Sequence, residues 1–454
     1  MVRKSMTRPQ VNSITMWVLV AVVGLVPLAL GGNRPLIWPI TLIFLSTALI
    51  ANYAALFRMG GTPAVSLRVF RLETAMMGIF LLFATMQVLP LPTLFGAAVD
   101  ALPITPALSI APTESFLALI TWVNVFILGF LAMQVSRNEQ RAVQFMSIIF
   151  WVVTIHAAVG FVLFHEFEDR TLIGPKWAYI GSMTGAFVNR NTFGTFLASG
   201  AVVGTVLILR DICLNGLIAK EPRAVRALLS RFIAMLLILA VLFGTGSRMG
   251  LFVGLVGILL VVMMVLLKQM KGSLGGITIL GAGAILTSGL LLLMLGYGGL
   301  TMERLGSIDR DVDVRFELYL QTWTMIMDRP WTGFGGGTYE LAFPLFHEPG
   351  VSVDLLWQKA HNSYLGLWAD YGLIFGTLPW LMLLVIVWRL VSIYRRRNPP
   401  DFGAIAAIAV ALVASLHAIV DFSLEIQGYA LLFAAIVGSG AARLSVPLSG
   451  KRAP

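Results

Sequence analysis

Apolar runs of about 20 residues recur along the whole chain and constrain its fold more than any other feature. As a helix, such a run spans the roughly 30 Å hydrocarbon core of a membrane. Backbone polar groups in that core must find partners within the protein, which a helix provides. Charged residues form only 12% of the chain, against about 25% in soluble domains. We predict an all-α polytopic membrane protein in which residues 1–454 form a single integral membrane domain.

The apolar runs predict about twelve membrane-spanning helices. Their approximate ranges are 13–31, 36–57, 74–95, 115–135, 143–164, 192–209, 232–246, 249–267, 275–297, 362–388, 403–420 and 427–444. Residues 298–361 form a large loop between the ninth and tenth helices. Loops of this length are usually functional or disordered, and a helical pattern within this one favours function.

Residues 1–31 also resemble a signal peptide, because Arg3, Lys4 and Arg8 precede an apolar run. A retained helix is favoured, since its removal would disrupt the alternation of charge between connecting segments. With a cytoplasmic N-terminus, most of the 32 Lys and Arg residues face the cytoplasm and most of the 22 acidic residues lie outside. This sorting follows the positive-inside rule and predicts that both termini are cytoplasmic. It accounts for the net charge of +10 without a nucleic-acid partner.

Three arginines, Arg190, Arg248 and Arg315, are predicted at the outer ends of apolar spans. Each has a structural explanation: snorkelling to lipid headgroups for Arg190, a tight glycine-containing turn for Arg248, and pairing with nearby carboxylates for Arg315. As a set they predict an anion site, because guanidinium groups bind phosphate oxygens in pairs. The carboxylates available to Arg315 are Asp311, Asp313 and Glu317.

Two asparagines, Asn189 and Asn191, flank Arg190 in the segment FVNRNTFG. Their side chains are expected to orient the guanidinium, and Asn191 is placed to cap the helix that follows. An arginine beside a helix N-terminus is a favourable site for an anion. The turn GTGSRMG around Arg248 adds backbone N–H groups that can point toward a phosphate.

The large loop contains a predicted amphipathic helix. Val312, Phe316, Tyr319, Trp323 and Ile326 recur at helical spacing. The preceding aspartates, Asp309, Asp311 and Asp313, are candidate N-caps, and Pro330 ends the pattern. Arg315 would then project from the first turn. The apolar stripe predicts that this helix lies either on the membrane surface or on the helical bundle.

His361 opens the tenth predicted span in the segment KAHNSYLG. A structural role is one alternative. The other is a neutral base, because nearby arginines disfavour the imidazolium form. On a continuous helix, Tyr364 and Trp368 would share its face and offer an aromatic surface to a sugar. Asn362 and Tyr364 are expected to support the site.

The remaining sequence patterns are weaker indications of function. The Gly-rich segment 330–339 lacks the GK[ST] ending of a P-loop, which leaves a turn or a close approach to a ligand. His156 is expected inside a span, and His165, His347 and His417 are isolated, with no metal-ligand spacing. The carboxylates Glu166, Glu168 and Asp169 favour a solvated loop over a divalent-ion site. The single cysteine, Cys213, excludes an intrachain disulfide. We expect neither a metal nor a cofactor.

The ordered segments FVNRNTFG, GSRMG, RFELYLQTWTMIMDRPWTGFGGGTYE and HNSYLGLWADYG resemble the O-antigen ligase and polysaccharide polymerase superfamily of bacterial inner membranes. The resemblance covers residues 180–385, although 340–358 contains no recognisable motif. It implies a glycosyltransferase C-like fold and a glycan donor on undecaprenyl diphosphate at the periplasmic face. It also implies that Arg190, Arg248 and Arg315 hold the diphosphate and that His361 acts on the acceptor hydroxyl, with no nucleotide or metal.

We therefore expect a glycan ligase with lipid A-core as its acceptor, in contact with membrane lipids. A repeat-unit polymerase of the same superfamily is the alternative. A flippase for polyprenyl-linked sugars is disfavoured, because the unusual charges lie at one face and not along a path through the bilayer. A non-catalytic assembly partner is a further alternative. The sugar, the linkage and the oligomeric state stay open.

Overall fold

The computed structural model describes residues 7–90, 107–216, 221–269, 283, 285, 286, 289, 302–352 and 356–447, with side chains of α11 from residue 314 onward. Helices form the regular structure of these residues, apart from one β-bridge between Thr171 and Gly174. Ten of the described helices are long and apolar enough to cross a membrane. The prediction of an all-α polytopic membrane protein is confirmed.

The α-helices are α1 (Arg8–Leu25), α2 (Ile37–Arg58), α3 (Arg71–Val88), α5 (Pro112–Ser136), α6 (Glu139–His165), α7 (Arg190–Asn215), α8 (Pro222–Gly244), α9 (Arg248–Gln269), α11 (Met302–Asp328), α12 (Tyr339–Ala342), α13 (Ser363–Arg396), α14 (Phe402–His417) and α15 (Gln427–Ala441). The 3₁₀ helices are η1 (Val26–Leu28), η2 (Leu30–Gly32), η3 (Leu67–Phe70), η5 (Phe343–Leu345), η6 (Ser423–Glu425) and η7 (Ala442–Ser445).

Eleven of the twelve predicted spans correspond to helices: the ten candidate spans and the shorter apolar helix α14. The ninth predicted span, 275–297, lies outside the described residues except at isolated positions. The total of twelve therefore stays a prediction.

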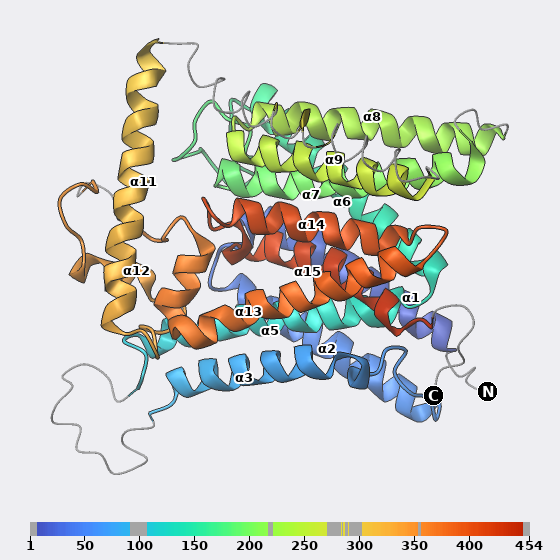
Figure 1. Ribbon diagram of the computed structural model, residues 1–454, viewed down its shortest axis with the longest axis horizontal. Helices are drawn as coiled ribbons and strands as arrows, with labels where there is room; N and C mark the ends of the chain where they lie inside the picture. Colours follow the sequence, from blue (N-terminus) through green and yellow to red (C-terminus); the bar gives the residue numbers. More distant parts are fainter. Residues whose placement is uncertain are drawn as a thin grey trace.

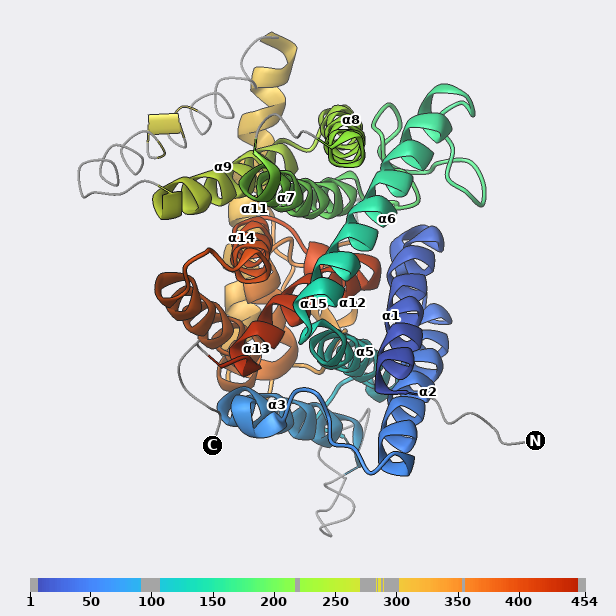
Figure 2. The same cartoon turned by 90° about the vertical axis from the view of Figure 1, so that its right-hand side faces the viewer.

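Two helices form the centre of the bundle. The apolar window of α7 is 89% buried and that of α15 is 83% buried, against 17% for α13. In Figure 2, α15 lies among α5, α6, α13 and α14. Glycine permits the close packing around α7, since a Cβ at Gly200 would lie 2.3 Å from the Val153 side chain. Small residues play this role between membrane helices generally.

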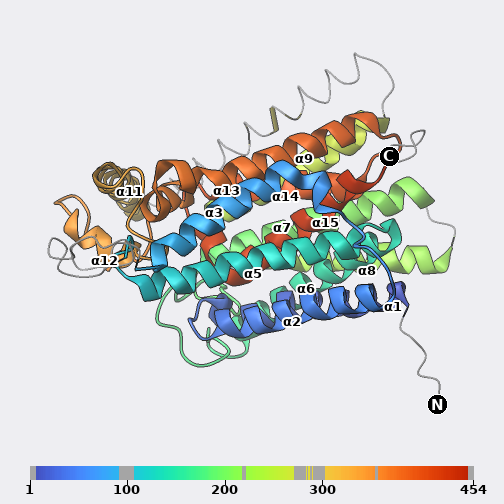
Figure 3. The ribbon, with the colours of Figure 1, turned by 90° about the horizontal axis from the view of Figure 1, so that it is seen from below.

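The helix α11 runs across the end of this bundle, at a steep angle to the other helices (Figures 1 and 3). We call this the α11 end of the bundle. The start of α1 and the end of α15 lie at the opposite end (Figure 1).

The structure corrects the predicted start of α11. The helix begins at Met302, so Asp309, Asp311 and Asp313 lie within it and do not precede it. Arg315 is therefore near the middle of the helix and not in its first turn. The predicted end is confirmed, because α11 ends at Asp328, two residues before Pro330. The apolar stripe begins only at Val312, so it does not reveal the polar residues before it that continue the helix.

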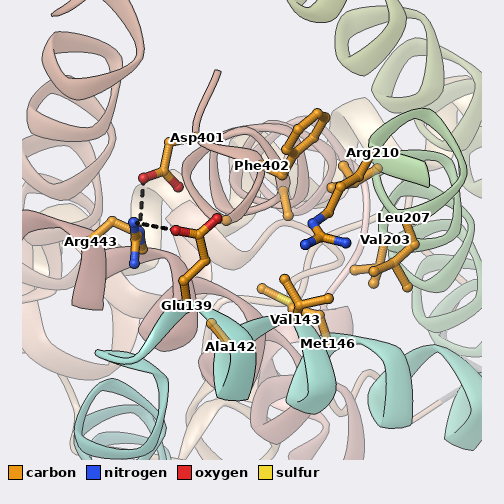
Figure 4. Close-up of a pocket in the computed structure, with 13 residues that line it drawn as sticks. Glu139, Ala142, Val143, Met146, Val203, Leu207, Arg210, Asp401, Phe402 and Arg443 are labelled. Atoms are coloured by element: carbon orange, nitrogen blue, oxygen red, sulfur yellow. Dashed lines mark hydrogen bonds and ion pairs between the residues drawn. The ribbon is translucent and has the colours of Figure 1, made fainter. Parts of the chain in front are cut away.

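A network of charged side chains closes the opposite end of the bundle (Figure 4). Arg443 Nε donates to Asp401 Oδ2 at 2.8 Å, and Asp401 also pairs with Arg397. A longer contact of 3.6 Å joins Arg443 to Glu139 at the start of α6. Arg210 faces the same small cavity from α7 (Figure 4). The network ties α6, α14 and the end of α13 to the segment after α15.

Candidate functional site

The segment before α7 holds Arg190 in place. The side chain of Asn189 caps α7 by accepting hydrogen bonds from the backbone N–H groups of Asn191, at 2.7 Å, and Thr192, at 3.4 Å. The prediction that Asn191 is the cap is therefore wrong by two residues. Asn191 instead accepts a hydrogen bond from Ser247 Oγ at 2.9 Å. The start of α7 is thereby joined to the turn that precedes α9.

Arg190 is half-buried against the loop between α6 and α7. Its guanidinium lies 5.5 Å from the centre of the Tyr179 ring, and Nη1 donates to Ser182 Oγ at 3.4 Å. The buried Nε has no hydrogen-bond partner among the described residues. An aromatic face and a hydroxyl position the cation without neutralising its charge.

Arg248 is the first residue of α9 and is half-buried. The turn before it is built on Gly246, which has a φ of 64°. A Cβ at Gly246 would lie 3.5 Å from Arg190 Nη1, so this turn adjoins Arg190 directly. The N-termini of α7 and α9 thus meet at the α11 end, where both helix dipoles favour an anion.

Arg315 and Tyr319 attach α11 to the end of the bundle. Arg315 Nη1 donates to the carbonyl oxygen of Val420 at 3.4 Å. The Tyr319 hydroxyl donates to the carbonyl oxygens of His361, at 2.9 Å, and Ile419, at 3.3 Å. Glu317, a predicted partner of Arg315, accepts instead from Gln321 at 3.2 Å. The side chains of Asp311 and Asp313 lie outside the described residues.

His361 precedes α13 and does not lie on it. Asn362 caps this helix by accepting from the N–H groups of Tyr364 and Leu365 at 3.0 and 3.1 Å. The φ of His361 is 51°, a conformation that turns it away from the helix axis. The prediction that Tyr364 shares a helical face with His361 is wrong. The Tyr364 hydroxyl instead donates to the carbonyl oxygen of Ser415 at 3.1 Å.

Tyr364 does not form the predicted aromatic surface with Trp368 beside His361. The ring of Tyr364 stacks on Trp380 at 4.1 Å. His361 instead contacts Phe422 and Trp357 edge to face, with ring centres 4.9 and 5.8 Å apart.

A buried carboxylate, Asp421, lies beside His361 and is not among the site residues predicted from the sequence. His361 Nδ1 lies 3.9 Å from Asp421 Oδ1, and both atoms are buried without a hydrogen-bond partner among the described residues. The Asp421 side chain is only 1% exposed, whereas that of His361 is 24% exposed. His361 can therefore face a ligand with part of its ring while Nδ1 faces the carboxylate.

Further contacts join Asp421 to α7 and α14. Ser423 Oγ donates to Asp421 Oδ2 at 2.8 Å and lies 3.3 Å from Thr195 Oγ1. His417 Nδ1 lies 3.7 Å from Asp421 Oδ2. His417 is thus not the isolated histidine that its sequence context suggested. Its i, i+4 spacing to Asp421 at the end of an apolar span was the signal available in the sequence.

The electrostatics show that these groups share one environment. Burial raises the pKa of Tyr179, Asp421 raises it further, and Arg190 and Arg315 lower it. Burial lowers the pKa of His361, and Arg315 acts in the same direction while Asp421 opposes both. Burial raises the pKa of Asp421. The neutral imidazole predicted from the sequence is therefore the favoured form near neutral pH.

The geometry brings Arg190, Arg315 and His361 together around Asp421 and Tyr179. Arg248 joins this group through its turn, which contacts the start of α7. The roles assigned to the four residues and to Asn189, Asn191, Asn362 and Tyr364 stay predictions.

The Gly-rich segment has a structural role against α13. The N–H groups of Phe334 and Gly335 donate to the carbonyl oxygens of Ala369 and Asp370 at 2.9 and 3.0 Å. A Cβ at Gly333 would lie 2.5 Å from the Asp370 backbone. The close backbone approach considered from the sequence is therefore made to α13, near the break at Gly372, where φ is 72°.

Among the acidic residues of the α6–α7 loop, Asp169 pairs with Lys176 and accepts from the N–H of Gly181 at 2.7 Å. No group of three or more metal-ligating side chains occurs within the described ranges. Metal independence stays a prediction.

Comparison with known families supports the resemblance found in the sequence. Residues 233–381 match the family model described as O-antigen ligase. This range includes Arg248, Arg315 and His361, while Arg190 and Asp421 lie outside it. No curated protein matches the chain. Residues 233–381, and with them three of the four predicted site residues, are thus similar to the O-antigen ligase family.

Proposed function

We propose that the protein transfers a glycan from undecaprenyl diphosphate to an acceptor hydroxyl at the periplasmic face of the bacterial inner membrane. The observation that carries this proposal is the position of His361 against the buried carboxylate of Asp421, next to Arg315 and Arg190. A neutral base and a set of cations are the groups that a glycosyl transfer from a diphosphate needs.

The three arginines act on the diphosphate leaving group. Arg190, Arg248 and Arg315 bind the diphosphate and stabilise the charge that develops on it, assisted by the N-termini of α7 and α9. Removal of one such donor in other enzymes costs about 10²–10³-fold in rate. Because diphosphate is already a good leaving group, these contacts both orient the donor and lower the barrier.

His361 serves the acceptor. Its neutral ring accepts the proton of the acceptor hydroxyl through Nε2, while Asp421 faces Nδ1 and stabilises the imidazolium that forms. The hydroxyl oxygen bonds to the anomeric carbon as the bond from that carbon to the diphosphate oxygen breaks. Undecaprenyl diphosphate leaves, and the anomeric configuration inverts. Base assistance of this kind contributes about 10²–10⁴-fold.

The basic residues support the orientation. Arg210 and Arg443 line one small cavity at the end of the bundle opposite α11 (Figure 4), and Arg231 and Arg397 pair with the neighbouring Asp211 and Asp401. The positive-inside rule then makes that end cytoplasmic, with both termini there and the loop 298–361 in the periplasm. The site at the α11 end would face the periplasm, where a glycosyltransferase C-like enzyme meets its lipid-linked donor.

A transfer assay with purified protein and a lipid-linked donor tests the proposal. His361→Ala and Arg248→Ala should each abolish most of the transfer. His165→Ala and Arg170→Ala are matched controls, because both residues are exposed near the α11 end outside the proposed site. Full activity of the His361 and Arg248 variants would contradict the mechanism.

Transfer to lipid A-core, rather than to another lipid-linked chain, is the form of the reaction that we propose. Gel analysis of the surface glycan from a deletion strain distinguishes the two. A ligase defect leaves full-length polymer on the lipid carrier, whereas a polymerase defect leaves single repeats.

A further inference from the structure

The helix α11 carries an exposed apolar flank formed by Phe316, Leu320, Trp323 and Met327. These side chains are 63%, 47%, 42% and 42% exposed, and their spacings of four, three and four residues place them on one side of the helix. Burial of such large apolar side chains away from water is favourable. Their joint exposure in water would be costly for the free protein.

The other sides of α11 already have partners or are polar. Leu318, Met325 and Ile326 are fully buried in the cluster that includes Tyr339 and Phe343. Arg315 and Tyr319 contact the end of the bundle. Thr324 and Asp328 are exposed on a polar flank. Within the described residues, these four side chains thus form an apolar side of the helix that is largely exposed.

This flank is continuous with the surface that α13 presents to lipid. The ring of Trp323 lies 6.2 Å from that of Trp368 on α13, and Trp368 Nε1 donates to Thr377 Oγ1 at 3.0 Å. Farther along α13, Ile374 and Trp388 are exposed on the membrane-spanning segment. Tryptophans concentrate where a membrane protein crosses from hydrocarbon to headgroups.

The direction of α11 fits the same environment. The helix crosses the ends of the membrane-spanning helices instead of running parallel to them (Figures 1 and 3). A helix with one apolar and one polar flank that lies across the bundle end has the geometry of an interfacial helix in the membrane plane.

We infer that α11 lies in the lipid leaflet at its end of the bundle, with Phe316, Leu320, Trp323 and Met327 immersed at the boundary between headgroups and acyl chains. The polar flank with Thr324 and Asp328 faces water. The contacts of Tyr319 and Arg315 then hold the segment around His361 at headgroup depth. The inference rests on exposure and continuity alone, so it stands or falls separately from the proposed reaction.

Site-directed fluorescence tests this placement in the full chain. The exposed Cys213 is first replaced (Cys213→Ser). Single cysteines are then introduced as Phe316→Cys, Trp323→Cys and Met327→Cys on the apolar flank and as Thr324→Cys and Asp328→Cys on the polar flank. Each is labelled with a small fluorophore in phosphatidylethanolamine–phosphatidylglycerol vesicles, with or without brominated acyl chains.

Brominated lipid should quench the three apolar positions severalfold more than the two polar positions, and aqueous iodide should show the reverse order. Met327 and Asp328 form the sharpest pair, because they are exposed neighbours on different flanks of the helix. Equal lipid quenching at all positions would overturn the inference. So would protection of the apolar flank from both quenchers, which would indicate a protein cover.

Discussion

The hydroxyl of Tyr319 on α11 donates a hydrogen bond to the backbone carbonyl of His361, 2.9 Å away. His361 has a φ of 51°, a conformation that costs a non-glycine residue about 1–3 kcal/mol. The contact therefore fixes the backbone from which the proposed base projects. It links α11 to the segment that precedes α13, and the sequence pattern assigns the two residues unrelated roles.

Tyr319→Phe should lower the transfer rate without unfolding the protein. The variant removes the hydroxyl's hydrogen bond to His361 and the longer one to Ile419. The bond to His361 is worth about 1 kcal/mol, which corresponds to about a fivefold loss in kcat if it holds His361 in its reactive position. Steady-state kinetics with a lipid-linked donor measure this loss in kcat. Thr324→Val is the matched control, since Thr324 lies on the exposed side of the same helix. A loss confined to KM would argue against a positioning role.

The pH dependence of transfer should follow the His361–Asp421 pair. Burial lowers the pKa of His361 from its ordinary value of about 6.5. The base is therefore neutral at pH 7, and kcat/KM should fall only when the pH drops below 6.5. The acidic limb reports the coupled pair and not one residue alone.

Asp421→Asn should move that acidic limb to still lower pH. The carboxylate opposes the lowering of the His361 pKa, so its removal lets burial and Arg315 depress the pKa further. The maximal rate should also fall, because the imidazolium loses its counter-charge. His165→Ala should keep the wild-type profile. A limb that stays in place or shifts to higher pH in the Asn variant is the contrary outcome.

Arginine geometry should matter as well as charge at Arg190. Arg190→Ala should lower kcat/KM by about 10²-fold or more. Arg190→Lys should recover only part of this loss, because an ammonium group cannot bind phosphate through a planar pair of donors. Arg170→Ala should have little effect. Full recovery by lysine would mean that Arg190 contributes only a general positive potential.

The helical architecture could be predicted because apolar runs in a membrane have few alternatives to helices. Arg190, Arg248 and His361 could be selected from their positions at span ends, and Arg315 from the predicted helix of the large loop, although their roles stay untested. The local backbone geometry at these positions was less predictable than the helices. Asn189 caps α7 in place of Asn191, and sequence alone does not show which of two neighbouring asparagines has the extended backbone of a cap.

Asp421 has only one sign in the local sequence, its i, i+4 spacing from His417. Its importance comes from contacts with His361, 60 positions earlier, and through Ser423 with Thr195, which only the packed bundle brings together. The sequence pattern predicts His361 at the start of a helix. The backbone turn that separates His361 from that helix depends on the contact with Tyr319 and on the cap at Asn362. Long-range contacts, more than composition, determine this site.

At the opposite end of the bundle, Asp401→Ala should destabilise the protein without a direct effect on chemistry. Asp401 pairs with Arg397 and Arg443 and accepts a hydrogen bond from the N–H of Ala404 at 3.2 Å, which caps α14. Its side chain is only 6% exposed. Loss of one partner of a buried ion pair costs about 3–5 kcal/mol, because the other charge stays buried. Thermal unfolding in lipid nanodiscs should show a clear decrease in Tm.

Glu139→Ala provides the control for this prediction. Glu139 also contacts Arg443, at 3.6 Å, but its side chain is 70% exposed, and exposed ion pairs contribute only about 0–1 kcal/mol. The Tm of the Glu139→Ala variant should therefore stay close to that of the wild type. Equal decreases in the two variants would mean that net charge at this end, and not the buried pairing, stabilises the bundle. Below the unfolding transition, transfer per folded molecule should match the wild type in both variants, because neither residue contacts the α11 end.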